Sequence, residues 1–251
     1  MAALIVFGCF FGLVKLFAQF MVIYIMDKLQ RRMSMYKQLK PSAILSPVPV
    51  VMVSCAGEYE GRQIDNIITV AWAGTICSEP PMVSISVRKS RLSHELISKS
   101  GEFVINFVSE DMARTADWCG VKSGREVSKF TEKGLSPIPV PEMKKAKAIA
   151  NCPVYLGCVV KQIIELGSHD MFIAEVVSAG ADEELFDEQG KLRLDLAELV
   201  AYCHGDYVTL GRLLGFYGYS VAAPKVYKER MAKLKAASKA RPEPIKKATP
   251  K

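Results

Sequence analysis

Hydroxyl and guanidinium side chains gather in Pro80–Ile97, PPMVSISVRKSRLSHELI, where the sequence predicts that a strand runs directly into a helix. Residues Met82–Val87 alternate and are rich in β-branched side chains, as in a half-buried strand. Either Ser90 or Ser93 offers an N-cap for the helix. A helix N-terminus presents unpaired N–H groups and a partial positive charge, so arginines and hydroxyls beside it suit a phosphate. An ordinary capped helix start on a solvated surface fits equally well. The candidate phosphate-binding residues are Ser86, Arg88, Ser90, Arg91 and Ser93.

A second segment, Asn66–Gly74 (NIITVAWAG), places a tryptophan, small residues and polar groups along one extended stretch. Ala71 and Trp72 would line a slot for a flat heteroaromatic ring, with Asn66 and backbone N–H groups at its rim. Taken alone, the segment is better interpreted as a core strand with a buried tryptophan.

The glycine-containing loop Asp117–Gly124 follows a predicted helix, and Lys129 comes shortly after it. Lys129 would neutralise a phosphate or face the electron-rich edge of a ring, although a solvated surface lysine is the commoner case. Cys119 is a candidate redox thiol, but an unreactive, partly buried thiol is the better interpretation of a cysteine in this setting.

His169 lies in the polar tip Gly167–Asp170 of an otherwise apolar hairpin. It would donate a hydrogen bond to a ring carbonyl or shuttle a proton, or be an ordinary turn histidine bonded to the backbone. The segment Tyr202–Tyr207 offers aromatic walls that would close a pocket, which is a weaker indication.

Several chemistries have no support in the sequence. It contains no GxGxxG fingerprint, P-loop, HExxH motif or local Ser/His/Asp signature, so a Rossmann domain, a nucleotide triphosphatase and a hydrolase are not indicated. The seven cysteines form no CxxC pair and the three histidines are scattered, so we expect no protein-bound metal. An odd number of cysteines indicates reduced thiols in a cytosol-like compartment.

The middle of the chain, residues 47–221, is predicted to be mostly β. Many strands and few helices favour a barrel, and the two longest strands read as a hairpin joined at Gly167-Ser168. We expect strands over Val48–Ser54, Ile67–Trp72, Met82–Val87, Glu102–Val108, Val154–Glu165 and Met171–Ala179, and short helices over Leu92–Lys99 and Asp111–Trp118.

The net charge of +7 is concentrated at the ends of the chain. Residues 1–40 carry a net +5 and residues 225–251 a net +8, whereas residues 41–224 carry a net −6. The high pI is therefore no sign that the folded domain binds nucleic acid, and we expect none. Residues 223–251 are predicted to be a basic, disordered tail.

Residues 1–26 are almost wholly apolar and long enough to span a bilayer, with Lys28, Arg31 and Arg32 directly after them. The positive-inside rule would then leave the rest of the chain in the cytoplasm. A start of translation at Met33 or Met35 explains the segment equally well. We therefore treat residues 1–34 as a membrane anchor or a mis-called start, and expect membrane contact only if residues 1–26 are translated.

Five segments, taken in order, resemble the flavin reductase-like family, most closely its flavoredoxin branch. They are PVPVVMVS, NIITVAWAG, EPPMVSISVRKSRLSHELI, EFVINFVSEDMARTADWCGVKSGREVSKF and GSHDMFIAEV. The resemblance covers roughly Tyr36 to Ser220 and implies a six-stranded antiparallel split β-barrel that forms a homodimer and binds FMN non-covalently. We assign the flavin reductase-like domain to residues 35–222 and expect it to lie in the cytoplasm.

The resemblance also implies roles for particular residues. Asn66, Thr69, Ala71 and Trp72 would contact the isoalloxazine ring, and His169 would lie near it. Ser86, Arg88, Arg91 and Ser93 would hold the phosphate and the ribityl chain. The remaining pocket residues would be Asn106, Cys119, Ser123 and Lys129.

The expected function is that of an FMN-dependent oxidoreductase, which moves electrons from NADH or NADPH to free flavin, a ferric chelate or a protein acceptor. A flavoredoxin-type electron carrier without its own NAD(P)H activity is the first alternative. A non-catalytic or membrane-tethered scaffold that binds another phosphate-bearing ligand is the second.

Overall fold

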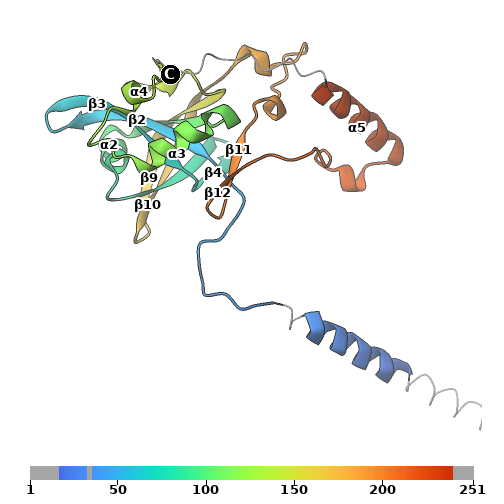
Figure 1. The fold of residues 1–251 in the computed structure, drawn as a ribbon. Coiled ribbons are helices and arrows are strands. Elements are labelled where there is room, and N and C mark those ends of the chain that lie inside the picture. Colours follow the sequence, from blue (N-terminus) through green and yellow to red (C-terminus); the bar gives the residue numbers. More distant parts are fainter. Residues whose placement is uncertain (1–16, 33–35, 240–251) are drawn as a thin grey trace, which may run out of the picture. The chain divides into compact units, whose positions relative to one another are not determined.

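The computed structural model describes residues 17–32 and 36–239 of the chain (Figure 1). The chain divides into two units, Met1–Ile44 and Leu45–Lys251. The second unit is built mainly from antiparallel strands with a few short helices. This confirms the predicted fold class.

Seven strands form the main sheet, in the order β3-β2-β6-β9-β10-β5-β4. Their bounds are β2 Val51–Tyr59, β3 Arg62–Val70, β4 Ala73–Ser78, β5 Pro81–Arg88, β6 Glu102–Phe107, β9 Val154–Glu165 and β10 His169–Ala181. Among the strands described, β3 and β4 are the two edges, so the barrel is split rather than closed. The predicted number of six strands is wrong because β4, a mostly exposed edge strand, was not expected.

The barrel interior is filled by alternate side chains of the strands, as the period of two requires. Val53, Ile85, Phe103 and Phe172 are among its buried members. The helix α2, Leu92–Ser100, closes this core with Leu92, Leu96 and Ile97. It lies so close to β2 that a Cβ on Gly57 would come within 3.3 Å of the Leu96 side chain.

A second apolar cluster holds the helices that follow β6 against the outer side of β2 and β3. The 3₁₀ turn Glu110–Met112 leads into α3, Ala113–Val121, and α4 follows at Lys129–Glu132. Met52 and Ile67 from the strands contact Ala116, Cys119 and Phe130 from the helices. This packing places α3 and α4 against β3.

A small sheet, β1-β11-β12, supplies one more wall near the site. Its strands are β1 Val48–Pro49, β11 Val200–Cys203 and β12 Asp206–Thr209. The hairpin of β11 and β12 pairs Tyr202 with Tyr207. Two further short strands, β7 Pro137–Ile138 and β8 Ala148–Ile149, pair with each other.

Three local predictions need correction. Trp72 lies in the bend between β3 and β4, not inside a strand, and is 45% exposed. The N-cap of α2 is Arg91, with no side-chain cap bond, so neither Ser90 nor Ser93 caps the helix. Residues 224–239 form the helix α5, Pro224–Lys239, so the predicted disorder of the tail is wrong there, while residues 240–251 lie outside the described residues.

The first unit contributes a helix over residues 17–32. Most of its apolar side chains are exposed, among them Phe17, Phe20 and Ile23. The anchor predicted for residues 1–26 falls partly on residues 1–16, which are outside the described residues. In the described part of the chain, no helix combines the length and the apolar character needed to cross a membrane.

Candidate functional site

Two adjoining cavities lie where the end of β3, the turn from β5 into α2 and the loop after α3 meet. The larger has a volume of about 350 Å³ and the smaller about 160 Å³. Ile68 and Arg91 line both cavities, so the two form one elongated site. The structure therefore brings together the two segments that the sequence singled out, Asn66–Gly74 and Pro80–Ile97.

Trp72 and His169 form an aromatic wall of the larger cavity. Their ring centroids are 4.4 Å apart, with an interplanar angle of 54°. His169 pairs with Arg88 in the register of β10 and β5, and the hydroxyl of Ser168 lies 2.8 Å from His169 Nδ1. Partial burial, and then the positive charge of Arg88, lower the pKa of His169 below its usual range. The imidazole is therefore neutral at pH 7 and able to both donate and accept a hydrogen bond.

Thr69 and Ala71 line the larger cavity beside this wall. The Thr69 hydroxyl donates a hydrogen bond to the Ala116 carbonyl, which ties β3 to α3. A Cβ on Gly120 would lie 3.2 Å from Thr69 Cβ, so the end of α3 approaches β3 closely. Thr69 therefore positions the helix as well as lining the cavity.

Ser86, Arg88 and Arg91 also line the larger cavity. The backbone N–H of Ser86 donates to the Trp72 carbonyl at 2.9 Å, which joins β5 to the bend after β3. The N–H of Arg91 donates to the Arg88 carbonyl at 3.0 Å and closes the turn that leads into α2. Both arginines are therefore presented from one tight turn.

The smaller cavity lies against the start of α2. Ser93 is buried, and its hydroxyl accepts a hydrogen bond of 2.9 Å from the side-chain amide of Asn66. Asn66 thus faces the smaller cavity, not the aromatic wall of the larger one. Ser123, from the loop after α3, lines the opposite side, and its hydroxyl accepts the backbone N–H of Arg125.

Lys129 also lines the smaller cavity and is almost fully buried. Its ammonium donates to the carbonyls of Ile67 and Cys119, each at 2.6 Å. Burial lowers the pKa of Lys129 to about 8. An ammonium has three protons, so one remains for a ligand. The alternative of a solvated surface lysine is wrong, because α4 carries this side chain into the protein.

Two predicted pocket residues lie elsewhere. Asn106 is fully buried in β6, where its amide donates to the Met52 carbonyl and the Ser54 hydroxyl and accepts from the Ile149 N–H. Its polar atoms are all used within the protein, so the prediction that it lines the pocket is wrong.

Cys119 is also fully buried, within the apolar cluster between α3 and β3. Burial raises the pKa of its thiol, which favours the unreactive interpretation. It serves the site through its carbonyl, which holds Lys129.

The predicted aromatic walls at Tyr202 and Tyr207 do line the larger cavity, with their rings edge to face at 5.8 Å. The Tyr207 hydroxyl donates to the Asp117 carboxylate at 3.2 Å, and burial together with that carboxylate raises the pKa of Tyr207 to about 12. Asp117 and Arg125 also line the two cavities, although neither was predicted as a site residue. Nothing in their local sequence marks them, because both act across the fold.

An open antiparallel barrel with an aromatic-walled cavity and an adjoining basic pocket at a helix N-terminus defines the class of flavin-binding split barrels. Residues 44–211 match the flavin reductase like domain. The chain belongs to the flavin reductase-like family.

Comparison with individual proteins agrees with this assignment. The chain is 31% identical to the protein YddH of Escherichia coli over 176 residues, which cover 68% of this chain and 91% of YddH. It is also similar to the solved structure of the flavoredoxin of Desulfovibrio vulgaris (Miyazaki F), with a TM-score of 0.68 and 27% identity, covering 74% of this chain and all of the flavoredoxin. A Rhodococcus opacus protein described as the reductase component of a 4-nitrophenol monooxygenase is 30% identical over 113 residues, which cover 45% of this chain and 57% of that protein.

Proposed function

We propose that this protein is an FMN-dependent oxidoreductase that accepts electrons from NADH or NADPH and delivers them to free flavin, a ferric chelate or a protein acceptor. The observation that carries the proposal is the joining of an aromatic-walled cavity to a basic one through Arg91. FMN has the matching shape, with a flat ring system at one end and a phosphate at the other.

The residues present fit such a ligand. Trp72, His169 and Ala71 offer a flat apolar wall with one polar edge for the isoalloxazine ring. Arg91, Lys129 and the N-terminus of α2 gather positive charge at the smaller cavity for the phosphate. Ser86 and Arg88 lie between Trp72 and Arg91 along the chain and would hold the ribityl chain or the phosphate.

When bound, FMN supplies the redox chemistry, and the protein binds, orients and tunes it. The neutral imidazole of His169 would hydrogen-bond a polar edge of the ring without adding charge. Tyr202 and Tyr207 would bound the space in which a planar donor or acceptor meets the flavin. We assign no side chain as a nucleophile.

A spectroscopic titration of the full-length chain tests the proposal. The purified protein is reconstituted with FMN, and its visible spectrum is recorded anaerobically before and after addition of NADH or NADPH. Rapid bleaching of the flavin absorbance by either donor supports a reductase and gives its preference. Bleaching by neither donor contradicts the reductase. A protein that does not bind added FMN would contradict the cofactor and favour the alternative of a scaffold for another phosphate-bearing ligand.

A pure FMN electron carrier is the second candidate function. The similarity to a flavoredoxin favours it, since that likeness is accompanied by 27% identity over the whole of the flavoredoxin. A flavin that stays oxidised with both nicotinamide nucleotides but is reduced by dithionite would support the carrier.

We further propose that the protein is a homodimer. The supporting observation is the exposure of large apolar side chains on the barrel, among them Ile76 on β4 (48% exposed) and Leu166 after β9 (56% exposed). Size-exclusion chromatography of the full-length chain with light scattering measures the mass of the species in solution. A monomer at micromolar concentration would contradict the proposal.

We propose the cytoplasm as its compartment, with an N-terminal anchor that leaves the domain there as the alternative. Burial raises the pKa of Cys55 and Cys158 to about 12, and neither forms a disulfide, as suits a reducing compartment. Retention of the tagged full chain in carbonate-washed membranes would support the anchor.

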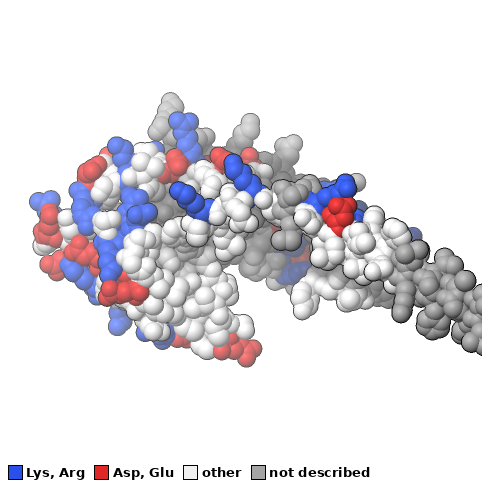
Figure 2. Space-filling model, turned by 90° about the horizontal axis from the view of Figure 1, so that it is seen from below, with Lys and Arg blue, Asp and Glu red and all other residues white. Residues whose placement is uncertain are grey.

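We expect no nucleic-acid partner. On the face drawn in Figure 2, basic and acidic side chains of the described residues are intermingled and form no single basic stripe.

A further inference from the structure

We propose that Arg125 is a positioning residue for the flavin phosphate, which fastens the loop after α3 to the N-terminus of α2 and so holds the smaller cavity in its binding shape. The inference rests on the proposed function, because it concerns the phosphate of bound FMN. We call residues 122–128, which join α3 to α4, the clasp loop.

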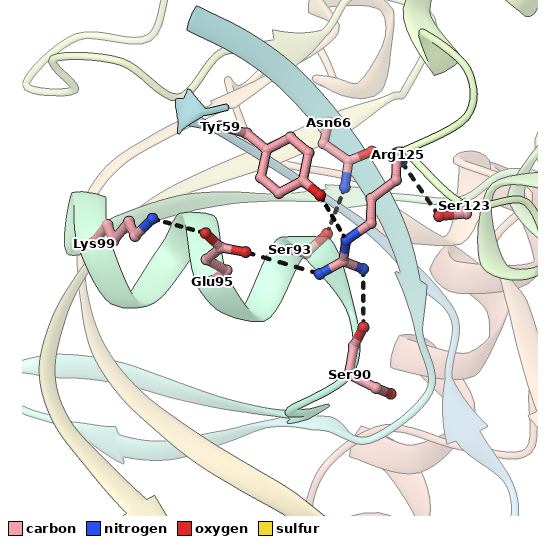
Figure 3. A network of polar contacts seen from close by, with 8 residues as sticks. All are labelled: Tyr59, Asn66, Ser90, Ser93, Glu95, Lys99, Ser123 and Arg125. Atoms are coloured by element: carbon pink, nitrogen blue, oxygen red, sulfur yellow. Dashed lines mark hydrogen bonds and ion pairs between the residues drawn. The ribbon is translucent and has the colours of Figure 1, made fainter. Parts of the chain in front are cut away.

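Arg125 reaches from the clasp loop to two other elements (Figure 3). Its Nη1 donates to the Ser90 carbonyl at 3.0 Å, and its Nε donates to the Tyr59 hydroxyl at 3.3 Å. Its guanidinium lies 5.6 Å from the centroid of the Tyr59 ring, and its Nη2 lies 3.8 Å from a carboxylate oxygen of Glu95. The Arg125 side chain therefore joins the clasp loop to the end of β2 at Tyr59. It also joins the loop to the start of α2, through Ser90 just before the helix and Glu95 in its first turn.

The bond to Ser90 fixes the peptide that directly precedes the helix. The carbonyl of the Ser90–Arg91 peptide is held by Arg125, while the N–H of the same peptide donates to the Arg88 carbonyl at 3.0 Å. With both polar groups held, this peptide cannot rotate without breaking a hydrogen bond. Arg91, whose side chain lines both cavities, and the free N–H groups of α2 are therefore held in place.

The clasp loop is itself in close contact with the far wall of the smaller cavity. The N–H groups of Glu126 and Val127 both donate to the Ser123 carbonyl, which curls the loop. A Cβ on Gly124 would lie only 2.1 Å from Asn66 Oδ1, so the loop backbone rests directly on Asn66. Asn66 in turn donates to Ser93 of α2. Arg125 and Asn66 thus each connect to the start of α2, and Figure 3 draws the Asn66–Ser93 bond and the contacts of Arg125 with Ser90 and Glu95.

Arg125 also offsets a carboxylate close to this anion site. Glu95 lies in the first turn of α2, where its negative charge opposes a bound phosphate. Lys99 pairs with it at 2.7 Å, and Arg125 approaches it from the other side. Because both Glu95 and Arg125 are about one-third exposed, at 34% and 37%, solvent screens this charge effect. The geometric restraint by Arg125 is therefore the larger contribution.

Parallel titrations of the full-length apoprotein with FMN and with riboflavin test the inference. Arg125→Met keeps the aliphatic stem and removes the guanidinium. We expect it to raise the Kd for FMN about tenfold, the scale of one hydrogen bond to a charged group. The Kd for riboflavin, which lacks the phosphate, stays within about twofold. Arg114→Met, at an exposed arginine on α3, is the control and leaves both constants unchanged.

Arg125→Lys separates positioning from simple charge. A lysine retains the positive charge but presents a single ammonium that cannot bridge Ser90, Tyr59 and Glu95 together. We therefore expect Arg125→Lys to bind FMN nearly as weakly as Arg125→Met. Full FMN affinity in Arg125→Lys would show that charge alone is needed and would overturn the inference.

Equal losses of FMN and riboflavin affinity in Arg125→Met would reduce Arg125 to general support of the fold and would also overturn it. So would unchanged affinity for both ligands. A wild-type protein that binds neither ligand would instead refute the proposed function, and the two failures are therefore distinguishable.

Discussion

Gly124 lies against Asn66 so closely that a Cβ at position 124 would come 2.1 Å from the Asn66 side-chain oxygen. This contact joins the clasp loop to β3 beside the smaller cavity, which both residues line. The φ angle of Gly124 is not in the left-handed region, so its backbone conformation does not require glycine. Glycine is required at this position because a side chain would clash with Asn66. The close approach of Gly124 to Asn66 sets the width of the proposed phosphate site.

Gly124→Ala is expected to push the clasp loop or Asn66 out of place. Overpacking of this kind costs about 1–3 kcal/mol of stability, which lowers the melting temperature. The FMN affinity is expected to fall about fivefold, because Asn66 would lose its bond to Ser93, and a hydrogen bond is worth roughly 1 kcal/mol. Calorimetry and FMN titration measure the two effects.

Gly211→Ala is the matched control for this substitution. A Cβ at position 211 meets no atom within 4 Å, so neither stability nor affinity should change. Wild-type behaviour of Gly124→Ala would show that Asn66 swings away freely, and the cavity would then not be held rigidly.

Trp72→Ala is expected to weaken FMN and riboflavin binding to the same extent. Trp72 lies beside the His169 ring in the larger cavity and does not line the smaller cavity, which is the proposed phosphate end. An aromatic contact is worth about 0.5–1.5 kcal/mol beyond its buried area, so a loss of roughly two- to tenfold is expected for both ligands. A loss restricted to FMN would place Trp72 at the phosphate end and contradict the assignment of the ring to the larger cavity.

Much of the barrel could be predicted from short-range patterns. The alternation in β5 and the Gly167 turn between β9 and β10 carry their own signals, and the structure has both elements. The strand β4 escaped prediction because Ala73–Ser78 is an exposed edge with little apolar alternation. The helix α5 escaped prediction because it has few apolar residues, of which Met231 is buried, and its many basic residues are typical of a disordered tail.

The site was predictable where one segment supplies several groups, as in the turn from Arg88 to Arg91. It was not predictable where a side chain acts across the fold. The sequence shows that Asn106 has a polar side chain, but not which groups it bonds. The folded sheet supplies its hydrogen-bond partners, which are the Met52 carbonyl, the Ser54 hydroxyl and the Ile149 N–H. Lys129 is buried only because α4 packs on β3, a contact that no local pattern encodes.

The pH dependence of FMN binding is expected to report on Lys129. Burial lowers the pKa of this ammonium to about 8, so a rise in pH through 8 removes a positive charge from the smaller cavity. FMN affinity should therefore fall between pH 7 and pH 9, while riboflavin affinity stays constant. Bound phosphate favours the charged form, so the midpoint should be higher in the complex than in the apoprotein.

Lys129→Met provides the control, since methionine has a similar length and no charge. We expect weak FMN binding with no midpoint between pH 7 and pH 9. An unchanged midpoint in this variant would assign the titration to another group. Burial raises the pKa of the Cys119 thiol, which moves its titration away from this range.

Arg88→Ala has two separate expected effects. FMN binding weakens by about 1.5–3 kcal/mol, the scale of a hydrogen bond made to a charged group. The pKa of His169 rises, because the charge of Arg88 is one of the two causes that lower it. Lys89→Ala is the matched control, since Lys89 is the next residue but its ammonium pairs with Glu165 at 2.6 Å. NMR titration of the His169 ring and FMN titration of both variants measure these effects. A raised His169 pKa with unchanged FMN affinity would keep Arg88 beside the ring wall but remove it from the phosphate and ribityl contacts.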